Sequence, residues 1–266
     1  MTLISTFSRA LVCAGVSISM LGGLTAIEAS AQTLKVATAY KLMTLDPHYA
    51  DLNENTSLLS HIFERLVYQD ENMEPQPGLA KSWKRLSDAQ WEFKLREDVK
   101  FHDGSPFTAQ DVVTTVERIQ HYLKPPSGGL AAYTQAISKI TATDPHTVVF
   151  ETSQADPTLP LSLASIFIVR HDDGGFKATG EMNRGLAVIG TGPYKFDSWQ
   201  SGETLKLVTN DDYWGTKPAW SEVVFRIIES PAARVAALAT GDVDLADYIP
   251  ARDVKMLKQR GAKVES

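Results

Sequence analysis

A hairpin followed by an amphipathic helix constrains the fold of this chain more than any other sequence feature. Residues 91–95 (WEFKL) alternate apolar with charged side chains. They follow residues 83–86 (WKRL), which begin and end with an apolar side chain, and residues 87–90 (SDAQ) separate the two runs. An alternation of period two is typical of a β-hairpin with one buried face. The apolar side chains of 108–123 recur instead at the spacing of one helical face, which predicts a helix. The chain is therefore expected to mix helices with antiparallel strands.

Both ends of this helix are marked in the sequence. The run Thr108-Ala109-Gln110-Asp111 resembles a capping box in which Asp takes the place of Glu. Residues 125–129 (PPSGG) then end the helix, because proline and glycine interrupt helical hydrogen bonding. The helix at 108–123 is therefore the best-defined element of the sequence.

The same patterns predict further elements on both sides of this region. They are a strand at 33–40, a helix at 53–66 capped by Asn53 or Asn55, two strands within 137–151 around the turn Asp144-Pro145-His146, a hairpin of 193–199 with 203–209, a strand at 223–228, a helix capped by Ser230, begun by Pro231 and ended by Gly241, a helix at 251–260 and the start of a strand at 263–265. No internal repeat or low-complexity segment is present.

The N-terminal residues 1–31 have the pattern of a cleavable signal peptide. Arg9 precedes an apolar run over 10–24, and Ala29-Ser30-Ala31 follows as a small-x-small cleavage site. A membrane anchor is the alternative, but the apolar run is short and contains Ser and Gly. We therefore expect export to the periplasm. The single cysteine, Cys13, would leave with the signal, so no disulfide partner is expected.

Charge and motifs argue against several classes of function. The formal net charge of −6 does not favour nucleic-acid binding. The phosphate-binding loop, the nucleophile elbow and the His-Glu-x-x-His motif are all missing from the sequence, and Gly190-Thr191-Gly192-Pro193 is followed by a predicted strand instead of a helix. The histidines are scattered without metal-ligand spacing, and His102-Asp103-Gly104 is typical of a turn. We therefore expect no catalysis, no cofactor and no metal site.

Two blocks of sequence carry a resemblance to a known family. The first comprises Leu79-Ala80-Lys81-Ser82-Trp83, residues 91–96 (WEFKLR), residues 99–104 (VKFHDG) and residues 107–113 (FTAQDVV), and it closes at Arg118. The second comprises residues 190–196 (GTGPYKF), Trp199, Gly202-Glu203, Asn210, Tyr213-Trp214-Gly215, Pro218, residues 233–238 (ARVAAL) and residues 241–244 (GDVD). Together they resemble the family 5 extracellular solute-binding proteins, the peptide- and nickel-binding components of ABC importers.

The resemblance implies a mixed α/β fold of the periplasmic binding protein type. Such proteins close two lobes around a cleft, with an extra domain inserted into the first lobe. The implied division is a signal peptide at 1–31, a discontinuous lobe I at 32–50 and 186–266, and an inserted α+β domain at 51–185. Because family members are roughly twice as long, the second lobe is expected to be missing from this sequence.

Candidate ligand-binding residues follow from the strand pattern and the implied fold. Ligands of open α/β sheets lie beyond the carboxyl ends of strands, which points to residues Tyr40 to Thr44, including Lys41 and Met43, after the first strand. An extended peptide could pair with the main chain there. The loop Thr191-Gly192 before Tyr194 is a second candidate, since glycine permits close approach of the backbone; a plain turn is the alternative for Gly192.

The resemblance further implies solute binding without chemistry, most simply for peptide import. The implied partners are a peptide or another small solute and an inner-membrane permease with its ATPase. Nickel, a sugar or another solute is the alternative ligand, and a truncated remnant that binds nothing is the alternative of a different class. With one wall of the cleft alone, the product of this sequence is expected to bind solutes weakly and to self-associate.

Overall fold

The computed structural model describes residues 32–122, 129–173 and 175–264. The predicted signal peptide at 1–31, with Cys13 and its cleavage site, lies outside the described residues, as do residues 125–128 of the predicted helix break.

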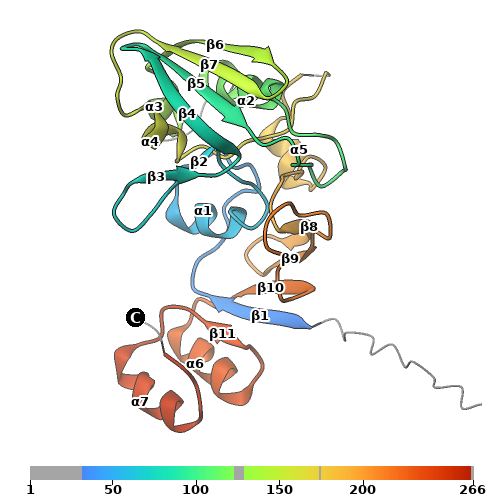
Figure 1. Ribbon diagram of the computed structural model, residues 1–266. Coiled ribbons are helices and arrows are strands. Elements are labelled where there is room, and N and C mark those ends of the chain that lie inside the picture. The colour runs from blue at the N-terminus through green and yellow to red at the C-terminus, as the bar shows by residue number, and fades with distance from the viewer. Residues whose placement is uncertain (1–31, 123–128, 174, 265–266) are drawn as a thin grey trace, which may run out of the picture. The chain divides into compact units, whose positions relative to one another are not determined.

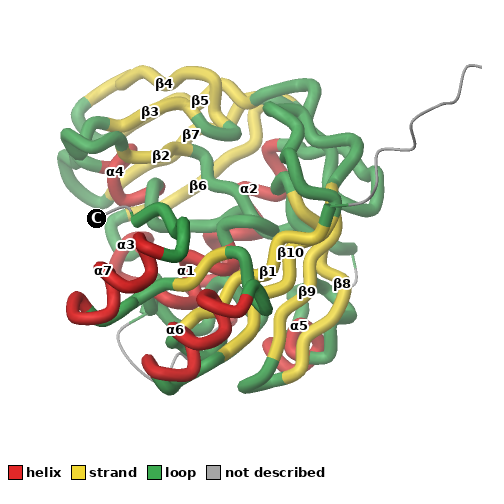
Figure 2. The backbone as a smooth tube through the Cα atoms, turned by 90° about the horizontal axis from the view of Figure 1, so that it is seen from below, coloured by secondary structure: helices red, strands yellow, loops and turns green. Residues whose placement is uncertain are grey.

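A five-stranded mixed sheet carries the parallel part of the fold. Its strand order is β11-β1-β10-β9-β8, and β1 (Thr33–Thr38) pairs in parallel with both β10 (Glu222–Ile227) and β11 (Leu245–Ala246). Strands β9 (Thr204–Thr209) and β8 (Tyr194–Gln200) continue antiparallel from β10 (Figure 1). Figure 2 shows β10, β9 and β8 side by side. The predicted first strand, the second hairpin and the strand near 223–228 are thereby confirmed.

The four-stranded sheet is antiparallel throughout, in the order β4-β5-β7-β6. It comprises β4 (Ala80–Ser87), β5 (Gln90–Leu95), β6 (Ile137–Asp144) and β7 (Thr147–Thr152), which confirms the predicted hairpin and the strands around Asp144-Pro145-His146.

Helix α2 (Ala109–Glu117) contacts β6 and β7 of this sheet, and it continues as a π-helical segment, η1 (Arg118–Tyr122). The predicted capping box is present, because the Asp111 carboxylate accepts hydrogen bonds from the Thr108 N–H and hydroxyl at 2.7 and 3.0 Å.

The remaining elements are short. They are α1 (Asn53–Leu59), β2 (Val67–Gln69), β3 (Pro75–Pro77), α3 (Ala131–Thr134), α4 (Leu159–Leu163), α5 (Thr179–Asn183), α6 (Pro231–Thr240) and α7 (Ala251–Gln259). In α6 the Ser230 hydroxyl accepts a hydrogen bond from the Ala233 N–H, and Gly241 ends the helix at φ 76°, as predicted. The elements β2, β3, β11, α3, α4 and α5 are too short to be recognised by periodicity.

The prediction for 53–66 was wrong in its length and its cap. Helix α1 ends at Leu59, because the carbonyl groups of His61 and Ile62 accept hydrogen bonds from Tyr194 and Gly192 instead of continuing the helix. Neither predicted asparagine caps it. Asn55 is buried within the helix, where its amide oxygen accepts from the Met43 N–H at 3.0 Å. The strand expected at 263–265 is also absent at Lys263 and Val264, and Glu265 is not among the described residues.

Each of the two larger sheets has its own apolar core. The four-stranded sheet and α2 enclose one core, which includes Phe93, Phe107 and Phe150. The five-stranded sheet covers the other, which includes Leu205 and Leu207 together with Leu58, Leu59 and Phe63. Leu58, Leu59 and Phe63 belong to the predicted inserted domain at 51–185, although they pack in the core under the five-stranded sheet. The predicted domain boundaries are not tested by this packing and stay a prediction.

A buried ion pair joins segments that are far apart in the sequence. Arg118 donates to both oxygens of Asp46 at 2.9 and 2.7 Å, and both side chains are almost completely buried. Arg118 also donates to the Lys177 carbonyl, and Thr179 donates to Asp46 at 2.6 Å. The pair therefore connects the loop after β1 to η1 and to the start of α5.

Loss of Arg118 should destabilise the protein far more than loss of an exposed arginine. In Arg118→Met the Asp46 carboxylate stays buried without its cation, so we expect the free energy of unfolding to fall by about 3–5 kcal/mol. Urea denaturation followed by circular dichroism measures this. Arg170→Met is the matched control: Arg170 pairs with Asp103 and Asp172 at partly exposed positions, and its loss should change stability by less than about 1 kcal/mol. Equal losses in the two variants would contradict this role for the buried pair.

Candidate functional site

A groove of about 580 Å³ lies at the parallel part of the five-stranded sheet. Its apolar lining comes from Leu34 and Val36 of β1, Val223 and Phe225 of β10, and Leu245 of β11. Helix α1 and the turn after it contribute Asn53, Glu54, Ser57, Leu58 and His61, and Thr38, Tyr40, Tyr194, Asp247 and Tyr248 complete the lining. Because β1, β10 and β11 are parallel, their carboxyl ends meet at one edge of the sheet, where ligands of open α/β sheets bind.

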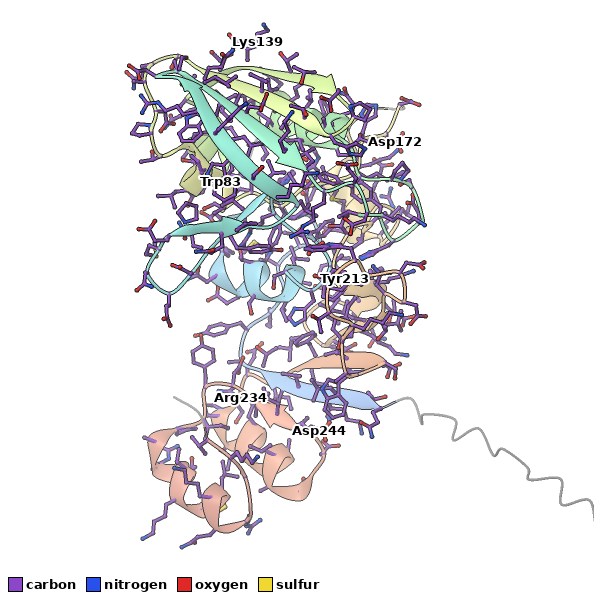
Figure 3. All side chains as sticks on the ribbon, in the orientation of Figure 1. Trp83, Lys139, Asp172, Tyr213, Arg234 and Asp244 are labelled. Carbon is purple, nitrogen blue, oxygen red and sulfur yellow. The ribbon has the colours of Figure 1, made fainter. Side chains whose placement is uncertain are left out.

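Arg234 of α6 fixes the loops that leave β10 and β11 at this edge (Figure 3). It is 2% exposed, and its guanidinium donates to the carbonyls of Ile228 and Glu229 after β10 at 2.7 and 2.9 Å. It also donates to the carbonyls of Asp247 and Tyr248 after β11 at 3.2 and 3.0 Å. One buried side chain therefore ties together the exits of two strands.

Asp247 extends this connection to β1. Its carboxylate accepts from the Thr38 hydroxyl at 2.7 Å and from the Ala39 N–H at 2.9 Å. The Asp247 carboxylate also lies 4.0 Å from Nε of Arg234, which offsets its charge. The carboxyl ends of all three parallel strands are thus held by polar side chains.

Two tyrosines meet edge to face beside these loops. The ring centroids of Tyr40 and Tyr248 are 4.8 Å apart at an interplanar angle of 87°. Tyr248 has a φ of 47°, which is unusual for a residue other than glycine, and Arg234 holds its carbonyl. The hydrogen bond with Tyr40, the nearby charge of Asp247 and that of Glu54 raise the pKa of Tyr248. Strain of this kind is more frequent at functional sites than elsewhere.

The structure separates the predicted site residues into two groups. Tyr40 and Tyr194 line the groove, whereas Lys41, Met43 and Thr44 are not among the described residues that line it. Lys41 forms an exposed ion pair with Glu229 at 2.6 Å, and the side chain of Met43 is 54% exposed. Thr44 is buried and donates to the Asn183 side chain at 2.8 Å, so its hydroxyl is already used within the protein.

Thr191 and Gly192 do not line the groove, and Gly192 lies against the chain that follows α1. Thr191 is 1% exposed, and the Gly192 N–H donates to the Ile62 carbonyl at 2.9 Å. A Cβ atom on Gly192 would lie 2.6 Å from the His61 carbonyl oxygen, so glycine is required for this approach of two backbone segments. The close approach predicted for Gly192 is therefore made to the protein itself.

His102 secures the same loop from its other side. Its Nδ1 accepts from the Gly190 N–H at 3.2 Å, which leaves Nε2–H to donate to the Gly192 carbonyl at 3.0 Å. Burial, together with the charge of Lys195, lowers the pKa of His102 to about 4. The turn predicted at His102-Asp103-Gly104 is present, with Gly104 at φ 88°. A neutral histidine thus has a structural role there.

The sequence predictions missed most of the groove. Asn53, Glu54 and Ser57 fell within a predicted helix, with Asn53 as a candidate cap, and none of the three was assigned to a binding site. Asp247 and Tyr248 follow a two-residue strand that no periodicity could reveal. The nearest sequence signal was the pattern Gly241-Asp242-Val243-Asp244, which begins immediately after α6 and leads into β11.

Other kinds of site were also considered. Among the described residues, no group of three or more His, Cys, Asp or Glu side chains is arranged to hold a metal ion. None of the helices in the described part of the chain combines the length and hydropathy of a membrane span.

Comparison with known proteins identifies the family. The family model of bacterial extracellular solute-binding proteins, family 5, matches residues 74–265. The chain belongs to this family.

Relatives of the family agree in sequence and in fold. The probable D,D-dipeptide-binding periplasmic protein of Escherichia coli is 35% identical over an alignment of 238 residues that covers 85% of this chain and 45% of the relative. The nickel-binding periplasmic protein of the same organism is 30% identical over 76% of this chain and 38% of the relative. The chain thus spans about half or less of the length of these family members.

A solved family structure confirms the predicted fold class. The oligopeptide-binding protein AppA of Bacillus subtilis, in complex with a nonapeptide, superposes with a TM-score of 0.77 at 27% identity. The match covers 85% of this chain and 46% of that structure. The chain therefore has the mixed α/β fold of part of a family 5 solute-binding protein.

The buried histidines His48 and His102 should make the stability of this protein depend on pH. Burial lowers the pKa of His48 and of His102 to about 4, whereas an unfolded histidine has a pKa near 6.5. Between these values the unfolded chain binds more protons, so the free energy of unfolding should fall as the pH decreases from about 6.5 to about 4. Each histidine contributes up to about 3 kcal/mol.

Urea denaturation at several pH values between 7.5 and 4.5 measures this dependence. In His102→Gln the part due to His102 should disappear, so the slope should become clearly smaller, while His48 and His61, whose pKa values burial also lowers, account for what remains. His121→Gln is the control, because that side chain is exposed. A slope that is unchanged in His102→Gln would contradict the argument.

Proposed function

We propose that this chain provides one wall of the ligand cleft in the solute-binding component of an ABC importer, and that the solute is a peptide. The observation that carries the proposal is the groove over β1, β10 and β11, whose lining extends to Tyr40 and Tyr248 beyond the carboxyl ends of β1 and β11. Its apolar floor suits side chains of a small ligand, and its tyrosines and carboxylates suit the polar ends.

The names of the relatives support a peptide as the solute. The curated relative with 35% identity is described as binding D,D-dipeptides, and the superposed AppA structure holds a nonapeptide. In this proposal the protein binds its solute and makes or breaks no bond. Its partners are an inner-membrane permease with its ATPase, and its location is the periplasm, reached through the signal peptide predicted at 1–31.

The segment after β1 has two parts in this proposal. Tyr40 contacts the ligand from the edge of the groove, while Lys41 and Met43 are exposed next to it and are available to a partner surface or to ligand main chain. Thr44 and Gly192 hold the walls in place through their contacts with Asn183 and Ile62.

Removal of either rim tyrosine should weaken peptide binding without destabilising the fold. The side chain of Tyr248 is 64% exposed, so Tyr248→Ala removes a contact surface and little core packing. We expect Tyr40→Ala and Tyr248→Ala each to lower affinity about fivefold, as for the loss of one aromatic contact. Isothermal titration calorimetry with a library of di- and tripeptides, extended to millimolar concentration, measures this.

Leu86→Ala provides the matched control, because Leu86 is an exposed apolar side chain of β4 outside the groove. Its affinity should stay within about twofold of the parent protein. If no peptide of the library binds, or if both tyrosine variants bind as the parent does, the groove is not the peptide site.

A further inference from the structure

Helix α7 and the residues after it carry a concentration of positive charge. Residues 251–264 contain five lysines and arginines but a single acidic residue, Asp253. All five cations are exposed: Arg252, Lys255, Lys258, Arg260 and Lys263. The formal net charge of the whole chain is −6. The charge of this segment is therefore opposite in sign to that of the protein as a whole.

The helix directs three of these charges to one side. At 3.6 residues per turn, positions 252, 255 and 258 fall within an arc of about 120°. The side chain of Leu257 lies opposite this arc and is 1% exposed, and α7 packs beside α6 (Figure 1). Arg252, Lys255 and Lys258 thus form one outward surface, which we call the α7 basic face.

The fold supplies little negative charge to neutralise the α7 basic face. Arg252 lies 3.6 Å from the Asp253 carboxylate, and the Arg252 side chain is 78% exposed, so this pair is open to solvent. Among the described residues, none forms an ion pair with Lys255 or Lys258. The charge of this face is therefore available to an anionic partner.

Helix stability explains only part of this arrangement. A cation in the last turn favours a helix because it faces the partial negative charge of the C-terminus, which accounts for Lys258. Arg252 lies in the first turn, where the partial positive charge of the N-terminus disfavours a cation. Lys255 lies between the two ends and gains from neither. The charges at 252 and 255 therefore fit a partner outside the protein.

The composition of the α7 basic face favours a lipid surface over a protein surface. Stable protein–protein interfaces have an apolar centre and are depleted of lysine. Within α7 the larger apolar side chains, Val254, Met256 and Leu257, are partly or completely buried, so the basic face has no such centre. Lysine places a compact charge on a flexible stem, which suits phosphates that are spread over a surface.

We infer that the α7 basic face binds the surface of a membrane that contains anionic phospholipids. The helix lies on the headgroups, and its apolar side stays packed within the protein. Because the remaining chain is acidic, the same membrane repels other faces, and the protein is oriented with α7 toward the lipid. Such a contact brings the protein close to the permease of the proposed importer, but the inference does not depend on peptide binding in the groove.

The test measures partition onto sucrose-loaded vesicles by sedimentation at pH 7 and low salt. One set of vesicles is phosphatidylcholine alone, and the other is an equal mixture of phosphatidylcholine and phosphatidylglycerol. The full chain is compared with the triple variant Arg252→Gln/Lys255→Gln/Lys258→Gln. Circular dichroism and urea denaturation show whether each protein is folded, which the exposure of the three substituted side chains leads us to expect.

A second triple variant, Lys81→Gln/Lys84→Gln/Lys139→Gln, is the control. It removes the same number of positive charges from exposed, ion-paired lysines of the four-stranded sheet, so the two triple variants have equal net charge. All three proteins have the same N-terminus, and any binding through the apolar residues 10–24 is therefore equal in them. Such binding would also be seen on the neutral vesicles.

We expect the parent protein to prefer the anionic vesicles, and 0.5 M salt to remove this preference because exposed charges are screened. One basic residue at an anionic surface strengthens binding about fivefold, so the α7 triple variant should bind these vesicles about 100-fold more weakly. The control should stay within about threefold of the parent, since its substitutions lie outside the contact.

Two results would overturn the inference. The first is a parent protein without preference for anionic vesicles, which would leave an acidic protein surface as the partner that fits these charges. The second is an equal loss of binding in the two triple variants, which would assign the effect to net charge alone. Neither result bears on peptide binding in the groove, which calorimetry measures separately.

Discussion

The arrangement of the two sheets depends on the ion pair between Arg118 and Asp46. The two side chains are 72 residues apart in sequence and are almost completely buried. Both oxygens of the Asp46 carboxylate accept hydrogen bonds from Arg118. His48 adds to it, because its Nε2 lies 2.7 Å from the Phe167 carbonyl and its Nδ1 lies 2.9 Å from Arg118. The surrounding chain has to supply enough apolar burial to offset the desolvation of these charges. The cores on either side, around Phe93 and Phe63, provide it.

Arg234 has a related role at the groove, but with carbonyl groups as its main partners. Its guanidinium gathers the loops after β10 and β11, and through Asp247 the end of β1 as well. At the rim Arg234 donates to the carbonyl of Tyr248, whose backbone has the left-handed conformation. A ligand therefore meets a surface that is fixed before it binds, which reduces the entropy lost on binding.

Much of the fold could be predicted because its elements have their own signals. The WEFKL alternation, the Asp111 capping box and the Ser230–Gly241 helix ends act over a few residues, and all are present in the structure. The predictions failed where distant backbone overrides local preference. Helix α1 ends at Leu59 because the carbonyl groups of residues 61 and 62 accept hydrogen bonds from the N–H groups of Tyr194 and Gly192, which are more than a hundred residues away. Tyr40 was predicted from the rule of strand ends and Tyr194 from the glycine-containing loop before it, and both line the groove. Glu54 and Tyr248 were not predicted: Tyr248 reaches the groove through the pairing of β11 with β1, and Glu54 through the position of α1.

The electrostatic character of the groove follows from how the fold uses its cations. Arg118 and Arg234 are both buried, and their guanidinium groups are committed to a carboxylate and to backbone carbonyls. Lys41, which follows Tyr40 in sequence, forms an exposed ion pair with Glu229 and does not line the groove. A chain with a net charge of −6 thereby keeps its positive groups away from the groove lining and leaves Glu54 exposed to whatever enters. Among the described residues, the groove lining therefore contains the acidic side chains of Glu54 and Asp247 and no lysine or arginine.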